Sequence, residues 1–334
     1  NGAMTNPLNS VEIRTTGVRV TRVGLGGAPL GGLYADVGVG AAADTVLKAH
    51  ELGVHYFDTA PLYGSGRSEL AYREALRQLD RNRYTISTKV GRVLMPVDTP
   101  PESEQFMNLP AMEPVFDFSR DGVLRSLEDS LERLGLDRID IALIHDPDDH
   151  YEQAIGEAYP VLAELRSQGV VGAIGAGMNQ WQMLADLARE GDFDCFLLAG
   201  RYTLLDRSGL AELLPLCAEK DIGIILGGPY NSGILASDLS SAATYDYMTA
   251  PPDILAQARR IKTVCDRHAV PLKAAALQFG LAHPAVVSII PGARSTTEVA
   301  ENLEMAAFPT PNDLWAELRE MGLIPDGAPT PASP

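Results

Sequence analysis

VHYFDTAPLYGSGRSELAYREALRQL, residues 54–79, shows how this chain is built. A short apolar run at 54–59 contains Asp58 near its end, a loop rich in Gly and Pro follows, and apolar residues then recur with helical spacing over 68–79. A continuous apolar run of this length is typical of a strand that is buried on both faces, as in a parallel sheet. The stretch therefore predicts one strand–loop–helix unit with an acid at the end of its strand.

The same alternation recurs about eight times along the chain. Apolar runs occur at 19–26, 54–59, 84–90, 139–145, 170–176, 195–200, 222–228 and 286–292. Segments with helical spacing lie between them, for example at 41–52, 68–79, 121–134, 154–168, 181–190 and 209–220. This order predicts a (β/α)8 TIM barrel that forms a single domain. A doubly wound open sheet is the rival, but no G-x-G-x-x-G follows the first run.

The predicted barrel occupies residues 16–323. We interpret 1–15 as an expression scar with a lead-in segment, and the Pro- and Ala-rich end, 324–334, as a flexible tail. Two connections, 91–119 and 228–252, are unusually long for loops without secondary structure. Both follow predicted strands, so they belong to the C-terminal face, where barrel active sites are built. Their aromatic residues are candidates for the walls of a pocket: Phe106, Phe116, Phe118, Tyr230, Tyr245 and Tyr247.

Composition narrows the classes of partner. A net charge of -17 argues against nucleic acid and anionic membranes as partners, because both need a basic protein surface. No apolar run reaches the roughly 18 residues of a membrane span, and no signal peptide is recognisable. The three cysteines are far apart in apolar surroundings, which indicates a reducing compartment and a cytoplasmic protein. The charge does not decide the oligomeric state.

Four ionisable residues fall at or just beyond the predicted C-terminal strand ends: Asp58, Tyr63, Lys89 and His145. A free tyrosine has a pKa of about 10, and a nearby ammonium lowers it. Lys89 supplies such a charge, Asp58 pairs with the lysine, and His145 can orient a substrate oxygen. Each residue alone has a commoner structural explanation, but their joint placement favours a general acid/base site. No metal is predicted, because the six histidines are scattered without an H-x-H pair.

The motifs FDTAPLYGSGRSE (57–69), STKVGR (87–92) and IDIALIHDPD (139–148) together resemble the aldo-keto reductase superfamily. The resemblance extends from residue 16 to residue 303. It implies a (β/α)8 barrel that transfers hydride to or from a nicotinamide dinucleotide bound across the barrel top. It also implies that Tyr63 is the acid/base, that Lys89 and Asp58 tune it, and that His145 orients the carbonyl or hydroxyl oxygen.

The resemblance further implies where the cofactor binds. The segment PGARSTTEVAEN (291–302) is similar to the part of the family that grips the adenosine phosphate, through Gly292, Arg294, Glu298 and Asn302. The segment GGPYNSG (227–233) is similar to a pyrophosphate loop, with Gly228, Pro229, Asn231, Ser232 and Gly233. Both segments also fit ordinary strand-to-helix turns.

Three positions depart from the family pattern. Asn179 stands one step beyond the usual Ser-Asn pair and is our candidate for the carboxamide, and Gly227 replaces the aromatic residue that often stacks on the nicotinamide. Glu298 occupies the position of an arginine in NADP-preferring members, and its charge would repel a 2′-phosphate. We therefore expect NAD as the cofactor, while the nearby Arg294 keeps NADP as an alternative.

The motifs HDPD, GAGMNQW and AGRYTLLD, with residues 116–140, resemble the aldose 1-dehydrogenase branch, which includes L-fucose and D-threo-aldose dehydrogenases, and pyridoxal 4-dehydrogenase. The resemblance implies a sugar or pyridoxal-like substrate whose cyclic hemiacetal is oxidised to a lactone. Asp146 and Asp148 are candidates for binding sugar hydroxyls. Two alternatives stay open: a general NADPH-dependent aldehyde or ketone reductase, and a regulatory subunit like the beta subunits of potassium channels.

Overall fold

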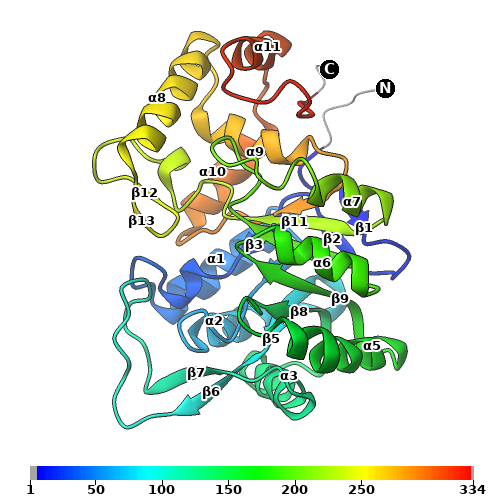
Figure 1. Cartoon of the computed structure of the whole chain (residues 1–334). Helices are drawn as coiled ribbons and strands as arrows, with labels where there is room; N and C mark the ends of the chain where they lie inside the picture. The colour runs from blue at the N-terminus through cyan, green and yellow to red at the C-terminus, as the bar shows by residue number, and fades with distance from the viewer. Residues whose placement is uncertain (1–5, 332–334) are drawn as a thin grey trace.

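Eight parallel strands form the centre of the protein (Figure 1). The computed structural model describes residues 6–331, so the proposed expression scar at the N-terminus lies outside the described residues. The strands are neighbours in the order in which they occur along the chain: β3 (Leu25–Gly26), β4 (Tyr56–Asp58), β5 (Thr85–Val90), β8 (Ile139–His145), β9 (Val171–Met178), β10 (Cys195–Ala199), β11 (Gly223–Gly227) and β14 (Val286–Ile289). Each of the eight predicted apolar runs contributes one of these strands.

The sheet closes on itself between its first and last strands. Parallel bridges pair Val23 with Ile289 and Gly26 with Gly292, and the backbone N–H of Gly24 donates to the carbonyl oxygen of Ile289 at 2.9 Å. Closure leaves no free edge on the central sheet. The predicted (β/α)8 barrel is confirmed.

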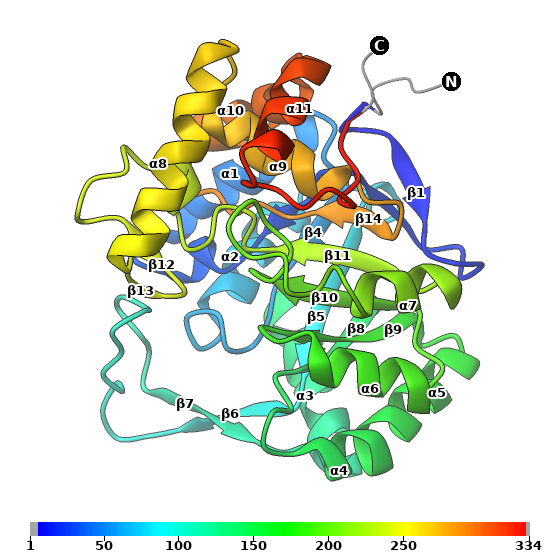
Figure 2. The ribbon, with the colours of Figure 1, turned by 45° about the horizontal axis from the view of Figure 1, so that its top comes forward.

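Helices cover the outside of the barrel (Figure 2). They are α1 (Val39–Glu51), α2 (Arg67–Leu76), α3 (Arg120–Leu134), α4 (Tyr151–Gln153), α5 (Tyr159–Ser167), α6 (Gln182–Glu190), α7 (Leu213–Glu219), α8 (Pro252–Arg267), α9 (Leu272–Leu281), α10 (Thr296–Ala307) and α11 (Asn312–Glu320). Short 3-10 turns lie at Pro29–Gly31, Arg81–Arg83 and Ile234–Ala236. The helix predicted over 154–168 begins instead with a π-helical turn, Ala154–Ala158, and the one predicted over 209–220 begins four residues later.

The first predicted strand, 19–26, differs from the structure because it is divided in two. Its first part, β2 (Arg19–Thr21), pairs antiparallel with β1 (Ser10–Glu12), and only Leu25–Gly26 joins the barrel. Ile13, which follows β1, is fully buried in a cluster with Tyr56 and Ile141. The β1–β2 hairpin therefore contributes apolar side chains to the barrel interior, and part of the predicted lead-in belongs to the fold.

The C-terminal segment is more ordered than the sequence suggests. Ile324 and Ala328 are buried, and Arg319 on α11 donates to the carbonyl oxygen of Ala328 at 3.0 Å and to the hydroxyl of Thr330 at 2.7 Å. These contacts hold 324–330 against α11, which differs from the expected flexible tail. Residues 332–334 lie outside the described residues.

The two long connections each contain a hairpin, and both lie on the same side of the barrel in Figures 1 and 2. β6 (Arg92–Pro96) pairs with β7 (Met112–Phe116), and β12 (Thr244–Tyr245) pairs with β13 (Met248–Thr249). Arg67 holds the first connection, because its guanidinium donates to the carbonyl oxygen of Met107 at 2.6 Å and to Asp36 at 2.6 Å. The connections are thus ordered parts of the C-terminal face.

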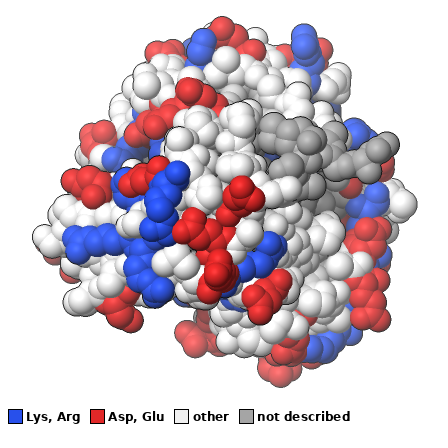
Figure 3. All heavy atoms as spheres, turned by 90° about the horizontal axis from the view of Figure 1, so that it is seen from above, with Lys and Arg blue, Asp and Glu red and all other residues white. Residues whose placement is uncertain are grey.

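Charged side chains lie on the surface, and the cysteines lie in the interior. Acidic and basic side chains are interspersed on the face seen from above, where α8 and α11 lie (Figure 3). Ion pairs formed by residues of α8 and α11 include Lys262–Asp266 and Arg267–Glu317. The three cysteines are buried and unpaired. Among the described residues, no helix combines the length and the apolar character that crossing a membrane requires.

Candidate active site

The four residues singled out in the sequence line one cavity of about 730 Å3 at the C-terminal ends of the strands. Asp58 is the last residue of β4, and Tyr63 lies in the turn between β4 and α2. Lys89 is the last but one residue of β5, and His145 ends β8. Because β4, β5 and β8 are consecutive neighbours in the sheet, residues that are distant in sequence meet at this edge.

Lys89 and Asp58 form a buried ion pair in the floor of the cavity. The ammonium group donates to both carboxylate oxygens, at 3.0 and 2.8 Å, and to the carbonyl oxygen of Thr59 at 2.9 Å. Both residues are 1% exposed. A buried lysine is costly unless its protons are all accepted, and here three acceptors match three protons. The pair is therefore well satisfied without any ligand.

Tyr63 lies above this pair. The Nζ atom of Lys89 is 4.6 Å from the centre of the Tyr63 ring, and the ring of His145 meets it edge-on with centroids 6.0 Å apart. Burial raises the pKa of Tyr63 well above its ordinary value, and the negative charges of Asp58 and Asp146 act in the same direction. This differs from our expectation that Lys89 lowers the pKa of Tyr63. The reason is that burial has the largest effect on this pKa, and Asp58 balances the charge of the ammonium.

His145 is a neutral imidazole at neutral pH. Burial and the positive charges of Arg92 and Lys89 hold its pKa well below the ordinary value. Its Nε2 atom lies 3.4 Å from the Oδ2 atom of Asp146. A neutral ring carries one N–H, so His145 can donate a single hydrogen bond to a substrate oxygen.

Arg92 is a lining residue to which the sequence assigned no role, although the motif STKVGR contains it. Its Nη2 atom donates to Asp146 at 3.1 Å, and its guanidinium lies 4.5 Å from the ring centre of Phe116. Gly91, with a φ of 106°, makes this placement feasible, because a Cβ atom there would lie 2.0 Å from the ring of Phe118. The pair Arg92–Asp146 thus adds a fixed donor and acceptor beside His145.

From the catalytic side the cavity continues to α10, whose residues Glu298, Glu301 and Asn302 line it. Of the ten residues assigned to the cofactor in the sequence, nine line the cavity: Asn179, Gly228, Pro229, Ser232, Gly233, Gly292, Arg294, Glu298 and Asn302. Asn231 is the exception. Its side chain is buried, and its Nδ2 atom donates to the carbonyl oxygen of Gly200 at 3.3 Å.

The sequence profile of the aldo/keto reductase family matches residues 22–322. The chain belongs to the aldo/keto reductase family. It is therefore an oxidoreductase of the kind that uses NAD(P)(H).

Two relatives agree with this family assignment, and one solved structure shares the fold. Pyridoxal 4-dehydrogenase from Microbacterium luteolum is 42% identical, and the match covers 92% of this chain and 96% of that protein. D-threo-aldose 1-dehydrogenase from Pseudomonas sp is 38% identical with the same coverage. The structure of the aldo-keto reductase AKR11C1 from Bacillus halodurans has a TM-score of 0.74 at 24% identity and covers 98% of both chains, which shows the common fold.

The cavity of this aldo/keto reductase fits a nicotinamide dinucleotide in size and in lining. Its volume lies within the range of cofactor sites. Gly228 and Gly233, with φ values of 57° and 97°, adopt the left-handed conformation that glycine favours. With no side chain there, the backbone between β11 and the 3-10 turn at Ile234–Ala236 can approach a phosphate closely.

The far end of the cavity is set by the first turn of α10. The Ser295 hydroxyl accepts the N–H of Glu298 at 3.2 Å, and the Glu298 carboxylate accepts the N–H of Arg294 at 2.7 Å. This reciprocal cap fixes a negative charge in the wall of the cavity. Asn302 is held as well, because its Oδ1 atom accepts the Tyr230 hydroxyl at 2.7 Å.

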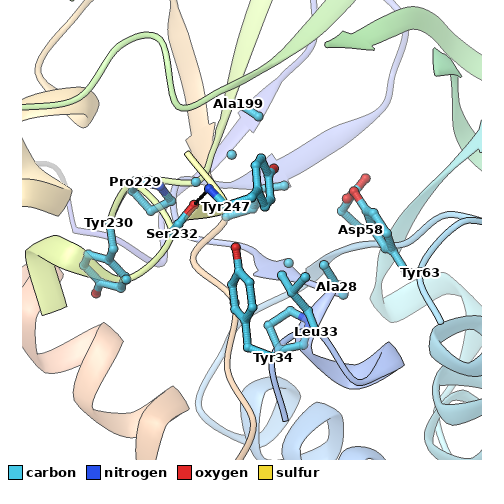
Figure 4. Close-up of a pocket in the computed structure, with 18 of the residues that line it drawn as sticks. Ala28, Leu33, Tyr34, Asp58, Tyr63, Ala199, Pro229, Tyr230, Ser232 and Tyr247 are labelled. Atoms are coloured by element: carbon cyan, nitrogen blue, oxygen red, sulfur yellow. Dashed lines mark hydrogen bonds between the residues drawn. The ribbon is translucent and has the colours of Figure 1, made fainter. Parts of the chain in front are cut away.

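Tyr34 and Tyr247 lie between the catalytic side and the far end of the cavity (Figure 4). The backbone N–H of Tyr247 donates to the hydroxyl of Ser232 at 2.8 Å, the contact drawn as a dashed line. The sequence analysis named Tyr247 among the wall aromatics, and Phe106 and Tyr230 line the cavity too, whereas Tyr245 does not. Tyr34 was missed, because no local pattern distinguishes a loop tyrosine that adopts a φ of 62° and lines the cavity from one that does not.

Proposed function

We propose that this protein oxidises the cyclic hemiacetal form of an aldose or of pyridoxal to a lactone, with NAD as the hydride acceptor. The observation that carries the proposal is the convergence of Tyr63 and His145 above the buried Lys89–Asp58 pair, in a cavity that continues to α10. The similarity to two dehydrogenases, one for pyridoxal and one for D-threo-aldoses, supports the choice of substrate class.

In this proposal the side chains of the protein accept the proton that the substrate loses and bind the substrate oxygen. The dinucleotide, when bound, accepts the hydride from the carbon that becomes the lactone carbonyl. Tyr63 takes the proton of the hydroxyl on that carbon, and the neutral His145 donates a hydrogen bond to the same oxygen. The Lys89–Asp58 pair holds a fixed polar floor beneath the phenol, so little reorganisation accompanies the proton transfer.

Arg92 and Asp146 support a polyhydroxylated or similarly polar substrate. Both line the cavity next to His145, and their ion pair has exposed fractions of only 12% and 21%. A guanidinium and a carboxylate side by side can donate to one oxygen and accept from another. A neighbouring hydroxyl or ring oxygen on the substrate would find both partners close to the reacting carbon.

Glu298 supports the preference for NAD over NADP. Its carboxylate is held in the cavity wall by the N–H of Arg294 and would repel a 2′-phosphate, while it can accept hydrogen bonds from ribose hydroxyls. Arg294 also lines the cavity, and its positive charge would attract a 2′-phosphate and so favour NADP.

The proposal is tested by following reduced-nicotinamide absorbance with purified protein. NAD and NADP are supplied in turn with L-fucose, L-galactose, D-arabinose and pyridoxal, and Tyr63→Phe serves as the control. We expect oxidation of one of these substrates with NAD and its loss in the variant. Consumption of NADPH with simple aldehydes, without oxidation of the hemiacetals, would identify a general reductase instead. Tight dinucleotide binding without turnover in either direction would point to a regulatory subunit.

A further inference from the structure

Ser87 and Tyr56 lie directly beneath the catalytic ion pair, and the sequence analysis assigned neither of them a role. Ser87 is two residues before Lys89 on β5, and Tyr56 is two residues before Asp58 on β4. Side chains two apart on a strand share a face. The parallel register places Ser87 opposite Asp58, and both Ser87 and Tyr56 are completely buried.

The hydrogen bonds between these residues have a fixed direction. The Oγ atom of Ser87 lies 2.6 Å from the Oδ1 atom of Asp58, and an ionised carboxylate only accepts, so Ser87 donates. The Ser87 oxygen then accepts from the Tyr56 hydroxyl, 2.8 Å away. Burial and the charge of Asp58 raise the pKa of Tyr56 well above its ordinary value, so the phenol keeps its proton. The chain runs from Tyr56 through Ser87 to Asp58.

A comparison with Ser288 shows that a buried serine in this barrel does not need a carboxylate as its hydrogen-bond acceptor. Ser288 on β14 is also completely buried, and its hydroxyl donates to the backbone carbonyl of Thr21 at 2.8 Å. A backbone acceptor is thus sufficient for a serine in the wall of this barrel. The hydroxyl of Ser87 donates to the carboxylate that holds Lys89 beneath Tyr63.

We infer that Ser87, supported by Tyr56, is a positioning residue for the acid/base chemistry, because it holds the Asp58 carboxylate in the orientation in which it accepts from Lys89. The inference rests on the proposed role of Tyr63. Without the hydroxyl, Asp58 keeps only the contacts from Lys89. With one contact fewer the carboxylate is less firmly oriented, and so is the Lys89 ammonium that it holds. When Asp58 holds Lys89 in place, the ammonium keeps its position next to the Tyr63 ring during turnover.

The kinetic test compares Ser87→Ala with Ser87→Thr and Ser288→Ala, using the substrate that the panel above identifies. We expect Ser87→Ala to lower kcat about tenfold or more, the range for a hydrogen bond to a charged group. KM for the dinucleotide stays the same, because Ser87 does not line the cavity. Ser87→Thr, which keeps a hydroxyl, recovers most of the rate. Ser288→Ala loses a buried serine hydrogen bond to a backbone carbonyl, so it reveals the effect of lower stability alone.

A second measurement needs no substrate. The chain has five lysines, at positions 48, 89, 220, 262 and 273, so proton–nitrogen NMR of lysine ammonium groups gives few signals. Lys89→Met identifies the signal of the buried ammonium. We expect Ser87→Ala to displace that signal, because the carboxylate that accepts from Lys89 loses its other donor. Ser288→Ala leaves it unchanged, and Tyr56→Phe produces a smaller effect in the same direction.

The outcomes separate this inference from the proposed function. If Tyr63→Phe retains turnover, the proposed function fails, while the Lys89 signal still tests Ser87. If Ser87→Ala does not fold, Tyr56→Phe decides through the same two measurements. The inference is overturned if Ser87→Ala and Tyr56→Phe keep the wild-type Lys89 signal and kcat and differ from wild type only in melting temperature, as Ser288→Ala does.

Discussion

The Nζ atom of Lys89 lies 2.8 Å from the Oδ2 atom of Asp58 and 4.6 Å from the centre of the Tyr63 ring. The pair has no net charge, so it does not lower the pKa of the phenol in the way that a lone ammonium would. It gives Tyr63 a rigid polar support, and the pKa of Tyr63 is governed by burial. The direction of that shift has a consequence for the pH dependence of the reaction.

Removing one partner of the buried Lys89–Asp58 pair should strongly destabilise the protein. Lys89→Met leaves the carboxylate of Asp58 uncompensated in the barrel, which is expected to lower the free energy of unfolding by about 3–5 kcal/mol. Lys262→Met, at an exposed pair with Asp266, should change it by less than about 1 kcal/mol. Urea unfolding followed by circular dichroism measures both. Equal losses in the two variants would contradict a tightly coupled buried pair.

The raised pKa of Tyr63 predicts opposite pH dependences for the two directions of the reaction. Oxidation needs the phenolate, which is scarce until the pH approaches a pKa well above 10, so the oxidation rate should rise with pH through the alkaline range. Carbonyl reduction needs the protonated phenol and should hold its rate over the same range. Profiles of kcat/KM in both directions, with Tyr63→Phe as the control, test this. An oxidation rate that is flat between neutral and alkaline pH would show that another group takes the proton.

Arg92 should control how the substrate is held. Its removal in Arg92→Met leaves Asp146 without its partner and takes a donor from the cavity, so KM for the hemiacetal substrate should rise about tenfold or more. The control is Arg125→Met, because Arg125 lies on the outer face of α3 with an exposed side chain. An unchanged KM in Arg92→Met would place the substrate elsewhere in the cavity.

The strands and the catalytic residues could be predicted from the sequence because their signals are local. The buried run 139–145 is continuously apolar, and its last residue is the histidine that faces the cavity. Asp58 and Lys89 follow the same rule on β4 and β5. Strand order then places these ends side by side, since consecutive barrel strands are neighbours.

The parts that could not be predicted depend on loop conformation and on tertiary electrostatics. Asn231 belongs to a glycine-rich loop but turns toward Gly200, and no local pattern distinguishes it from Ser232, which lines the cavity. Tyr34 reaches the cavity because Leu33 bridges Phe106 from a distant connection. The shift of Tyr63 depends on burial and on charges brought together by folding, so a list of neighbours in the sequence gave the wrong sign.

Glu298 should decide the choice between the two dinucleotides. Glu298→Gln keeps an oxygen that can accept the N–H of Arg294, so the cap on α10 survives, but the negative charge in the cavity wall is gone. We expect the ratio of kcat/KM for NADP to that for NAD to rise about tenfold, which corresponds to about 1.4 kcal/mol. Glu304→Gln, on the exposed side of the same helix, removes the same charge away from the cavity and should leave the ratio unchanged. Equal ratios in both variants would mean that Arg294, rather than Glu298, determines the cofactor.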